Sequence, residues 1–164
     1  MPKVAFLCHG DPLSPHGLTF KSCSRMLNLA EVIAGEILGI RLIFSAEEHE
    51  AKQTARLFAE MFRVNVETHP GLSNDGDKRM IEAFIRSLMA EKRPAIVVTH
   101  RRIMGRMLKE AVRQAGRPFI FTDKRSRRGT PALRRKLLEF APRAIIIDTA
   151  TMEARIVSVK KHAV

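Results

Sequence analysis

The chain is 164 residues long and carries 29 Lys and Arg side chains against 17 Asp and Glu, a formal net charge of +12 at pH 7. A hydrophobic content of 45% beside 28% charged residues is typical of a globular protein and excludes intrinsic disorder. Two cysteines exclude a disulfide framework, and no apolar run approaches the roughly 20 residues that a membrane-spanning helix needs. The first apolar run is also too short for a signal peptide, so we expect a cytoplasmic protein with one domain over residues 1–164.

Strands and helices alternate from the start of the chain. The apolar run 4–8 predicts a buried strand, and the Gly, Pro and Ser residues over 10–18 predict a loop. Apolar residues at helical spacing from Phe20 onward predict a helix whose N-cap is Thr19 and whose end is marked by Gly39. Phe20 is expected on its buried face.

The middle of the chain continues this alternation. Residues 41–45 predict a second strand. The glutamates over 47–50 indicate the start of a second helix, because negative charge is favoured at a helix N-terminus. A short strand is expected over 64–67 and a loop over 69–77, followed by a third helix that ends before Pro94.

The run 95–99 is the strongest signal of a parallel strand in the chain, and a helix that ends at Gly116 follows it. Residues 117–141 predict a basic loop and then a helix, and 144–148 and 154–159 predict two strands that pair as a hairpin. These elements predict a three-layer α/β domain with a mostly parallel central sheet and helices on both faces.

Two histidines lie at the ends of predicted strands. His9 follows the first strand, and His100 lies between the 95–99 strand and the next helix. Open α/β sheets bind ligands at the carboxyl ends of their strands, and a helix N-terminus favours an anion. A pair of imidazoles placed there suits a phosphate, one as nucleophile and the other as a hydrogen-bond donor to the transferring group. A single histidine at a strand end is more often structural, so the prediction depends on the pair.

Four motifs come in a characteristic order: Leu-Cys-His-Gly-Asp at 7–11, Leu-Thr at 18–19, Ala-Lys-Gln-Thr-Ala at 51–55 and Val-Val-Thr-His at 97–100. Together they resemble the histidine phosphatase superfamily, whose fold is phosphoglycerate mutase-like. The Asp after His-Gly and the Gly-Asp pair at 76–77 are similar to the small phosphohistidine phosphatases of the SixA type. The resemblance covers residues 3–115.

The resemblance implies hydrolysis of phosphohistidine or small phosphomonoesters through a phosphohistidine intermediate, without a cofactor. His9 would take the phosphoryl group and His100 would stabilise it. Asp77 or Asp75 would protonate the leaving group, and Asp11 would contribute. The alternative for the two loop aspartates is a cap on the third helix, which we favour for Asp75.

The chain departs from the family pattern where that pattern has arginines. Cys8 and Glu50 stand at those two positions, and guanidinium groups are the preferred ligands of phosphate oxygens. We therefore expect reduced or absent activity. The alternative is a non-catalytic pseudophosphatase that binds a phosphorylated or polyanionic partner.

Four residues are candidates to bind phosphate in place of the missing arginines: Thr19, Arg25, Arg101 and Arg102. The last two lie at a helix N-terminus, where cations oppose the helix dipole, so they either face the site or point to solvent. Cys8 is interpreted as a buried apolar residue rather than a nucleophile or metal ligand, and no metal is expected.

The positive charge is concentrated in one segment. Residues 101–136 carry 13 basic and 2 acidic side chains, whereas residues 1–100 carry 12 of each. This segment predicts a binding surface for nucleic acid, an acidic protein or a phosphorylated partner. Its two aromatic residues, Phe119 and Phe121, are too few for sequence-specific binding of single strands. The candidate partner-binding residues are Arg106, Arg113, Lys124, Arg125, Arg127 and Arg128.

Overall fold

The computed structural model describes residues 2–9, 12–14, 17–122 and 143–159. Its elements are β1 (Lys3–Cys8), β2 (Pro12–Ser14), β3 (Gly17–Leu18), α1 (Phe20–Glu36), β4 (Leu42–Ser45), α2 (His49–Phe62), β5 (Val66–Thr68), the 3-10 helix η1 (Pro70–Leu72), α3 (Lys78–Ala90), β6 (Ala95–Thr99), α4 (Arg101–Ala115), β7 (Ile120–Phe121), β8 (Arg143–Asp148) and β9 (Glu153–Ser158).

A seven-stranded sheet in the order β5-β4-β6-β1-β8-β9-β7 forms the centre of the fold. The strands β5, β4, β6 and β1 are mutually parallel, β8 is antiparallel to both β1 and β9, and β7 is parallel to β9. Within the described sheet, only β8 therefore runs against the other strands. The predicted mostly parallel sheet and the predicted β8–β9 hairpin are both confirmed.

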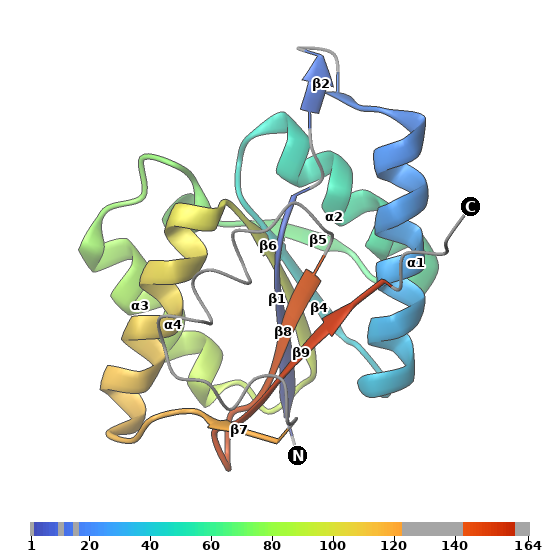
Figure 1. Ribbon diagram of the computed structural model, residues 1–164. Helices are drawn as coiled ribbons and strands as arrows, with labels where there is room; N and C mark the ends of the chain where they lie inside the picture. Colours follow the sequence, from blue (N-terminus) through green and yellow to red (C-terminus); the bar gives the residue numbers. More distant parts are fainter. Residues whose placement is uncertain (1, 10–11, 15–16, 123–142, 160–164) are drawn as a thin grey trace.

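The helices cover both faces of this sheet, with α1 and α2 on one side and α3 and α4 on the other (Figure 1). This division follows from the strand order. The chain moves outward from β1 to β4 and β5, then returns through β6 toward β1. Because βαβ crossovers are right-handed, a reversal of direction across the sheet moves the connecting helix to the opposite face. The three-layer architecture is confirmed.

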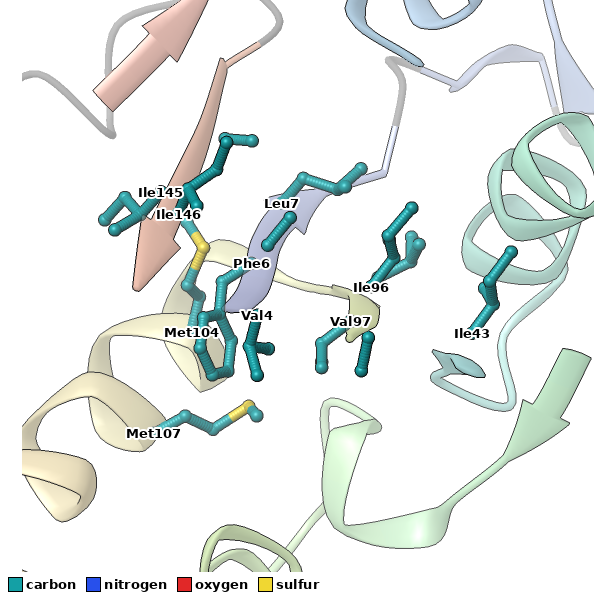
Figure 2. Close-up of a cluster of buried hydrophobic side chains, with 14 of the residues drawn as sticks. Val4, Phe6, Leu7, Ile43, Ile96, Val97, Met104, Met107, Ile145 and Ile146 are labelled. Atoms are coloured by element: carbon teal, nitrogen blue, oxygen red, sulfur yellow. The ribbon is translucent and has the colours of Figure 1, made fainter. Parts of the chain in front are cut away.

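The core lies along the two central strands. Val4 to Leu7 of β1 and every residue of β6 are buried, as expected for parallel strands covered on both faces. On one face, Met104 and Met107 of α4 point toward Val4 and Phe6 (Figure 2). This packing fixes the ends of β1 and β6, which carry the two predicted site histidines.

Three local predictions were wrong. The expected loop over 10–18 contains the β2–β3 pair, which forms a small separate sheet. Helix α1 ends at Glu36, because Ile37 is extended, and Gly39 with φ 65° makes the turn after the helix. Phe20 is 91% exposed, because the buried face of α1 begins at Ser22 and continues through Met26, and Phe20 lies two residues, or about 200° around the helix, from Ser22.

The basic segment 117–141 is only partly described. Residues 120–121 form a short strand, β7, in place of part of the expected loop, because they pair with β9. The helix expected after residue 130 lies outside the described residues. Within the described part of the chain, no helix has the length and apolar character needed to cross a membrane.

Candidate functional site

The carboxyl ends of three parallel strands meet at one edge of the sheet. The His9 N–H donates to the Thr99 carbonyl at 3.1 Å, so the chain after β1 stays paired with the end of β6. On the other side of β6, the Ala46 N–H donates to the Val98 carbonyl at 3.0 Å. The residues that follow β1, β6 and β4 are therefore held next to one another, as the strand-end prediction requires.

The structure brings His9 and His100 together at this edge. Their ring centroids lie 4.8 Å apart, with the ring planes at 71°. His100 is the N-cap residue of α4 and is 8% exposed, and its carbonyl accepts the Met104 N–H at 2.8 Å. Its side chain makes no cap hydrogen bond, so the ring is available to the site.

A third side chain, Glu48, enters the site from the turn after β4. Its Oε2 lies 3.0 Å from Nε2 of His100 in an ion-pair contact, and neither buried atom has a hydrogen bond of good geometry among the described residues. Its Oε1 accepts the Asn74 N–H at 2.7 Å. Burial raises the pKa of Glu48, but the hydrogen bond from the Asn74 N–H and the close contact with His100 outweigh burial and bring this pKa below its ordinary value of 4.5. Glu48 is therefore an ionised group at neutral pH.

The loop after β5 supports this carboxylate. The Thr99 hydroxyl donates to the Leu72 carbonyl at 2.6 Å, and the Glu47 N–H donates to the Ser73 hydroxyl at 3.0 Å. A Cβ on Gly76 would lie 2.9 Å from two backbone carbonyl oxygens of the same loop, so only glycine fits this turn without a shift. The loop is thereby tied to the ends of both β6 and β4.

Cys8 and Arg101 lie near the same edge. Burial raises the pKa of the Cys8 thiol to about 11, and the positive charge of Arg101 opposes this rise. A thiol with so high a pKa is protonated at neutral pH, which favours the interpretation of Cys8 as a packing residue. The charge of Arg101 reaches the position where the family pattern has an arginine. Arg101 is half-buried, whereas Arg102 is exposed.

The other replaced position, Glu50, lies in the first turn of α2 and is half-buried. Two side chains of the Gln-Thr-Ala motif that follows it make hydrogen bonds to the backbone. Gln53 accepts the Leu18 N–H through Oε1 at 2.7 Å, and the Thr54 hydroxyl donates to the Glu50 carbonyl at 2.9 Å. Gln53 thus connects α2 to the β2–β3 pair.

The remaining predicted residues near the site have mixed placements. Thr19 accepts the Ser22 N–H at 3.2 Å, which confirms it as the cap of α1. Asp77, not Asp75 as expected, caps α3, because its Oδ1 accepts the Met80 N–H at 2.8 Å. Arg25 is exposed on α1. Asp11 lies outside the described residues.

The basic face of α4 is exposed but partly neutralised. Arg106 and Arg113 line a groove of about 400 Å³ between α3 and α4. Arg113 donates from Nε and Nη2 to the buried carboxylate of Glu110, at 2.8 and 2.6 Å. Its guanidinium is therefore paired with a carboxylate of its own helix, although the Arg113 side chain stays exposed. Lys124, Arg125, Arg127 and Arg128 lie outside the described residues.

Sequence reasoning missed Glu48. The three glutamates over 47–50 were interpreted as helix-terminal charges, although only Glu50 lies in the first turn of α2. The available signal was position, because Glu48 follows the strand that neighbours β6 at the ligand-binding edge. Among the described residues, no group of three or more His, Cys, Asp or Glu side chains is arranged to hold a metal ion.

Comparison with known proteins identifies the fold. No family model and no curated protein matches the sequence. Among solved structures, the protein histidine phosphatase SixA complexed with tungstate has a TM-score of 0.62 at 18% identity, over 94% of each chain. A putative phosphohistidine phosphatase SixA from Agrobacterium tumefaciens has a TM-score of 0.62 at 16% identity, over 98% of this chain and 97% of the other.

Phosphoglycerate mutase from Plasmodium falciparum has a TM-score of 0.58 at 13% identity, over 98% of this chain and 90% of the other. These similarities extend over nearly the whole length of the proteins compared, so residues 7–9, 51–55 and 97–100 of the motifs lie in the expected fold. The chain therefore has the phosphoglycerate mutase-like fold of the SixA-type histidine phosphatases.

Proposed function

We propose that the chain binds phosphoryl groups at His9 and His100 and hydrolyses phosphohistidine or small phosphomonoesters slowly, through a phosphohistidine at His9. The observation that carries the proposal is the packing of the two imidazole rings, 4.8 Å apart, at the ligand-binding edge of the sheet. The N-terminus of α4 lies at the same place and favours an anion. The tungstate complex of SixA supports the use of oxyanions as probes.

In the first step, a ring nitrogen of His9 attacks phosphorus. A nitrogen–phosphorus bond forms while the bond from phosphorus to the leaving group breaks, and an acid gives that group a proton. Asp77 is the proposed acid, through the oxygen that does not cap α3. Water then attacks phosphorus and gives a proton to the Asp77 carboxylate, while the nitrogen–phosphorus bond breaks and phosphate leaves. His100 donates a hydrogen bond to the transferring oxygens.

The site lacks the groups that make such a reaction fast. Cys8 and Glu50 replace two cationic side chains, and loss of one transition-state donor typically lowers a rate about 10²–10³-fold. We therefore expect turnover at least about 10²-fold below the median enzyme value of about 10 s⁻¹. Arg101 is the proposed partial replacement, because its charge acts at Cys8.

The proposal is tested by phosphate release from an aryl phosphate and from a phosphohistidine peptide, with His9→Ala as the control. Slow release that His9→Ala abolishes supports the site and the reduced rate. Turnover at an ordinary enzymatic rate, abolished by the same substitution, contradicts the reduced rate. Release that persists in His9→Ala contradicts the site.

A second candidate function is a non-catalytic pseudophosphatase that binds a phosphorylated or polyanionic partner through residues 101–136. The exposed side chains of Arg102, Arg106 and Lys109 along α4 favour it. Binding through phosphate contacts weakens steeply with added salt. Binding of duplex DNA or RNA to the wild type at low salt, together with loss of this binding in the double variant Arg106→Ala and Lys109→Ala, supports this candidate. No detectable binding at low salt removes its nucleic-acid form.

A further inference from the structure

We propose that Glu48 is a specificity-determining residue that selects against doubly charged oxyanions, because its carboxylate occupies the place on His100 where an oxyanion would bind. The proposal rests on the proposed function, since it assumes that His100 is an anion-binding group. Glu48 would shift the preference of the site toward the singly charged form of a phosphoryl group, which a phosphomonoester adopts below its second pKa of about 6.

The contact itself is direct. Oε2 of Glu48 and Nε2 of His100 lie 3.0 Å apart in an ion-pair contact, and neither buried atom has a hydrogen bond of good geometry among the described residues. A phosphate oxygen that bound to this nitrogen would need the same position at the same distance. The carboxylate and the ligand therefore compete for one donor.

The carboxylate is also held in place. Its second oxygen accepts the Asn74 N–H at 2.7 Å, and the neighbouring Glu47 N–H donates to the Ser73 hydroxyl at 3.0 Å. Both partners belong to the loop after β5, which the Thr99 hydroxyl ties to β6. Movement of Glu48 away from His100 would therefore break the hydrogen bond to Asn74, so the competition opposes every ligand at this donor.

Charge decides which ligands overcome this competition. At close distance, the repulsion between Glu48 and a bound oxyanion grows in proportion to the charge of the anion. Removal of the negative charge at position 48 therefore relieves twice as much repulsion energy for a dianion as for a monoanion of the same shape. If the affinity for the monoanion rises by a given factor, the affinity for the dianion rises by the square of that factor. Tungstate and perrhenate are such a pair, since both are tetrahedral and they differ by one charge.

The experiment measures dissociation constants of tungstate and perrhenate for the wild-type chain and for Glu48→Gln, at neutral pH and low salt. Glutamine keeps an acceptor for the Asn74 N–H, removes the charge and places an amide NH2 in place of Oε2 opposite His100. Glu47→Gln is the matched control, because it makes the same change of charge at the adjacent, exposed side chain. The chain has no Trp or Tyr, so histidine ring resonances in NMR titrations report binding.

We expect Glu48→Gln to bind tungstate about tenfold more tightly, a change of about 1.4 kcal/mol. For perrhenate, the square-root relation gives about a threefold gain. Glu47→Gln should stay within about twofold of the wild type for both anions, because surface charges are screened. Thermal melting shows whether each variant folds, and Glu48→Ala provides a second variant with the same expected direction.

Each other result has a distinct meaning. Equal tungstate affinities in the wild type and both Glu48 variants overturn the role of Glu48 and leave the proposed function in place. An equal gain in Glu47→Gln also overturns it, because the effect is then one of general charge. Equal gains for tungstate and perrhenate overturn selection by charge. Absence of anion binding in every variant overturns the proposed function itself.

Discussion

Replacement of Arg101 by alanine tests whether its guanidinium faces the site. In the structure, burial raises the pKa of the Cys8 thiol to about 11, against an opposing contribution from the charge of Arg101. At about pH 8, a thiol with this pKa is ionised in only about one molecule in 10³, and each further unit of pKa lowers this fraction tenfold. Loss of Arg101 removes the opposing charge, so the pKa of Cys8 should rise further.

The assay is the rate of alkylation of Cys8 by iodoacetamide, because the thiolate is the reactive form. Peptide mass mapping separates Cys8 from Cys23, the other cysteine of the chain. We expect Cys8 of the wild type to react about 10³-fold more slowly than a fully ionised thiol at about pH 8. Arg101→Ala should slow it roughly threefold more, since one half-buried charge near the surface contributes on the order of 1 kcal/mol or less.

Arg102→Ala is the matched control, because Arg102 is the adjacent cation and its side chain is exposed. It should leave the alkylation rate unchanged. If Arg101→Ala and Arg102→Ala have the same effect, or neither has any, the charge of Arg101 does not act at Cys8. Arg101 then cannot replace the missing arginine, and the residual activity that we propose loses its cationic support.

Three further predictions concern stability. Thr99→Val should lower the free energy of unfolding by about 1–3 kcal/mol, because it removes the buried hydroxyl that donates to the Leu72 carbonyl. Thr99→Ser keeps a hydroxyl and should lower the free energy of unfolding by less, and thermal melting measures both variants. Gly76→Ala should lower the melting temperature, because its Cβ would lie 2.9 Å from backbone oxygens, but Gly35→Ala in open space on α1 should raise it or leave it unchanged. The lowered pKa of Glu48 means that its carboxylate stabilises the fold above pH 4.5 and loses this contribution as the pH falls through the lowered value. The melting temperatures of wild type and Glu48→Gln should therefore differ at neutral pH and converge in acid; a constant difference would contradict the shift.

Local patterns predicted the parts of the fold that local physics controls. Thr19 caps α1, Gly116 ends α4 with φ 66°, and the two histidines follow adjacent strands, because each feature depends on a few consecutive residues or on strand order. Phe20 is exposed because the buried face of α1 begins at the polar Ser22, which a pattern of apolar residues does not reveal.

The predicted site was incomplete for a related reason. Glu48 contacts His100 only because β4 lies beside β6 and the loop after β5 holds the carboxylate. Neither relation appears in the local sequence, where three glutamates before a helix have an adequate explanation in the helix dipole. Arg113 differs in this respect, because it pairs with Glu110 three residues earlier on the same helix, a spacing that the local sequence does show.

The central claim is that His9 accepts a phosphoryl group beside His100. Its most direct test is incubation with a reactive aryl phosphate, rapid quenching in alkali, where phosphohistidine survives, and peptide mass spectrometry. We predict a phosphoryl group on His9 that acid removes and that is absent from His9→Ala. A phosphoryl group on another residue, or an unmodified His9 during measurable phosphate release, would contradict the claim.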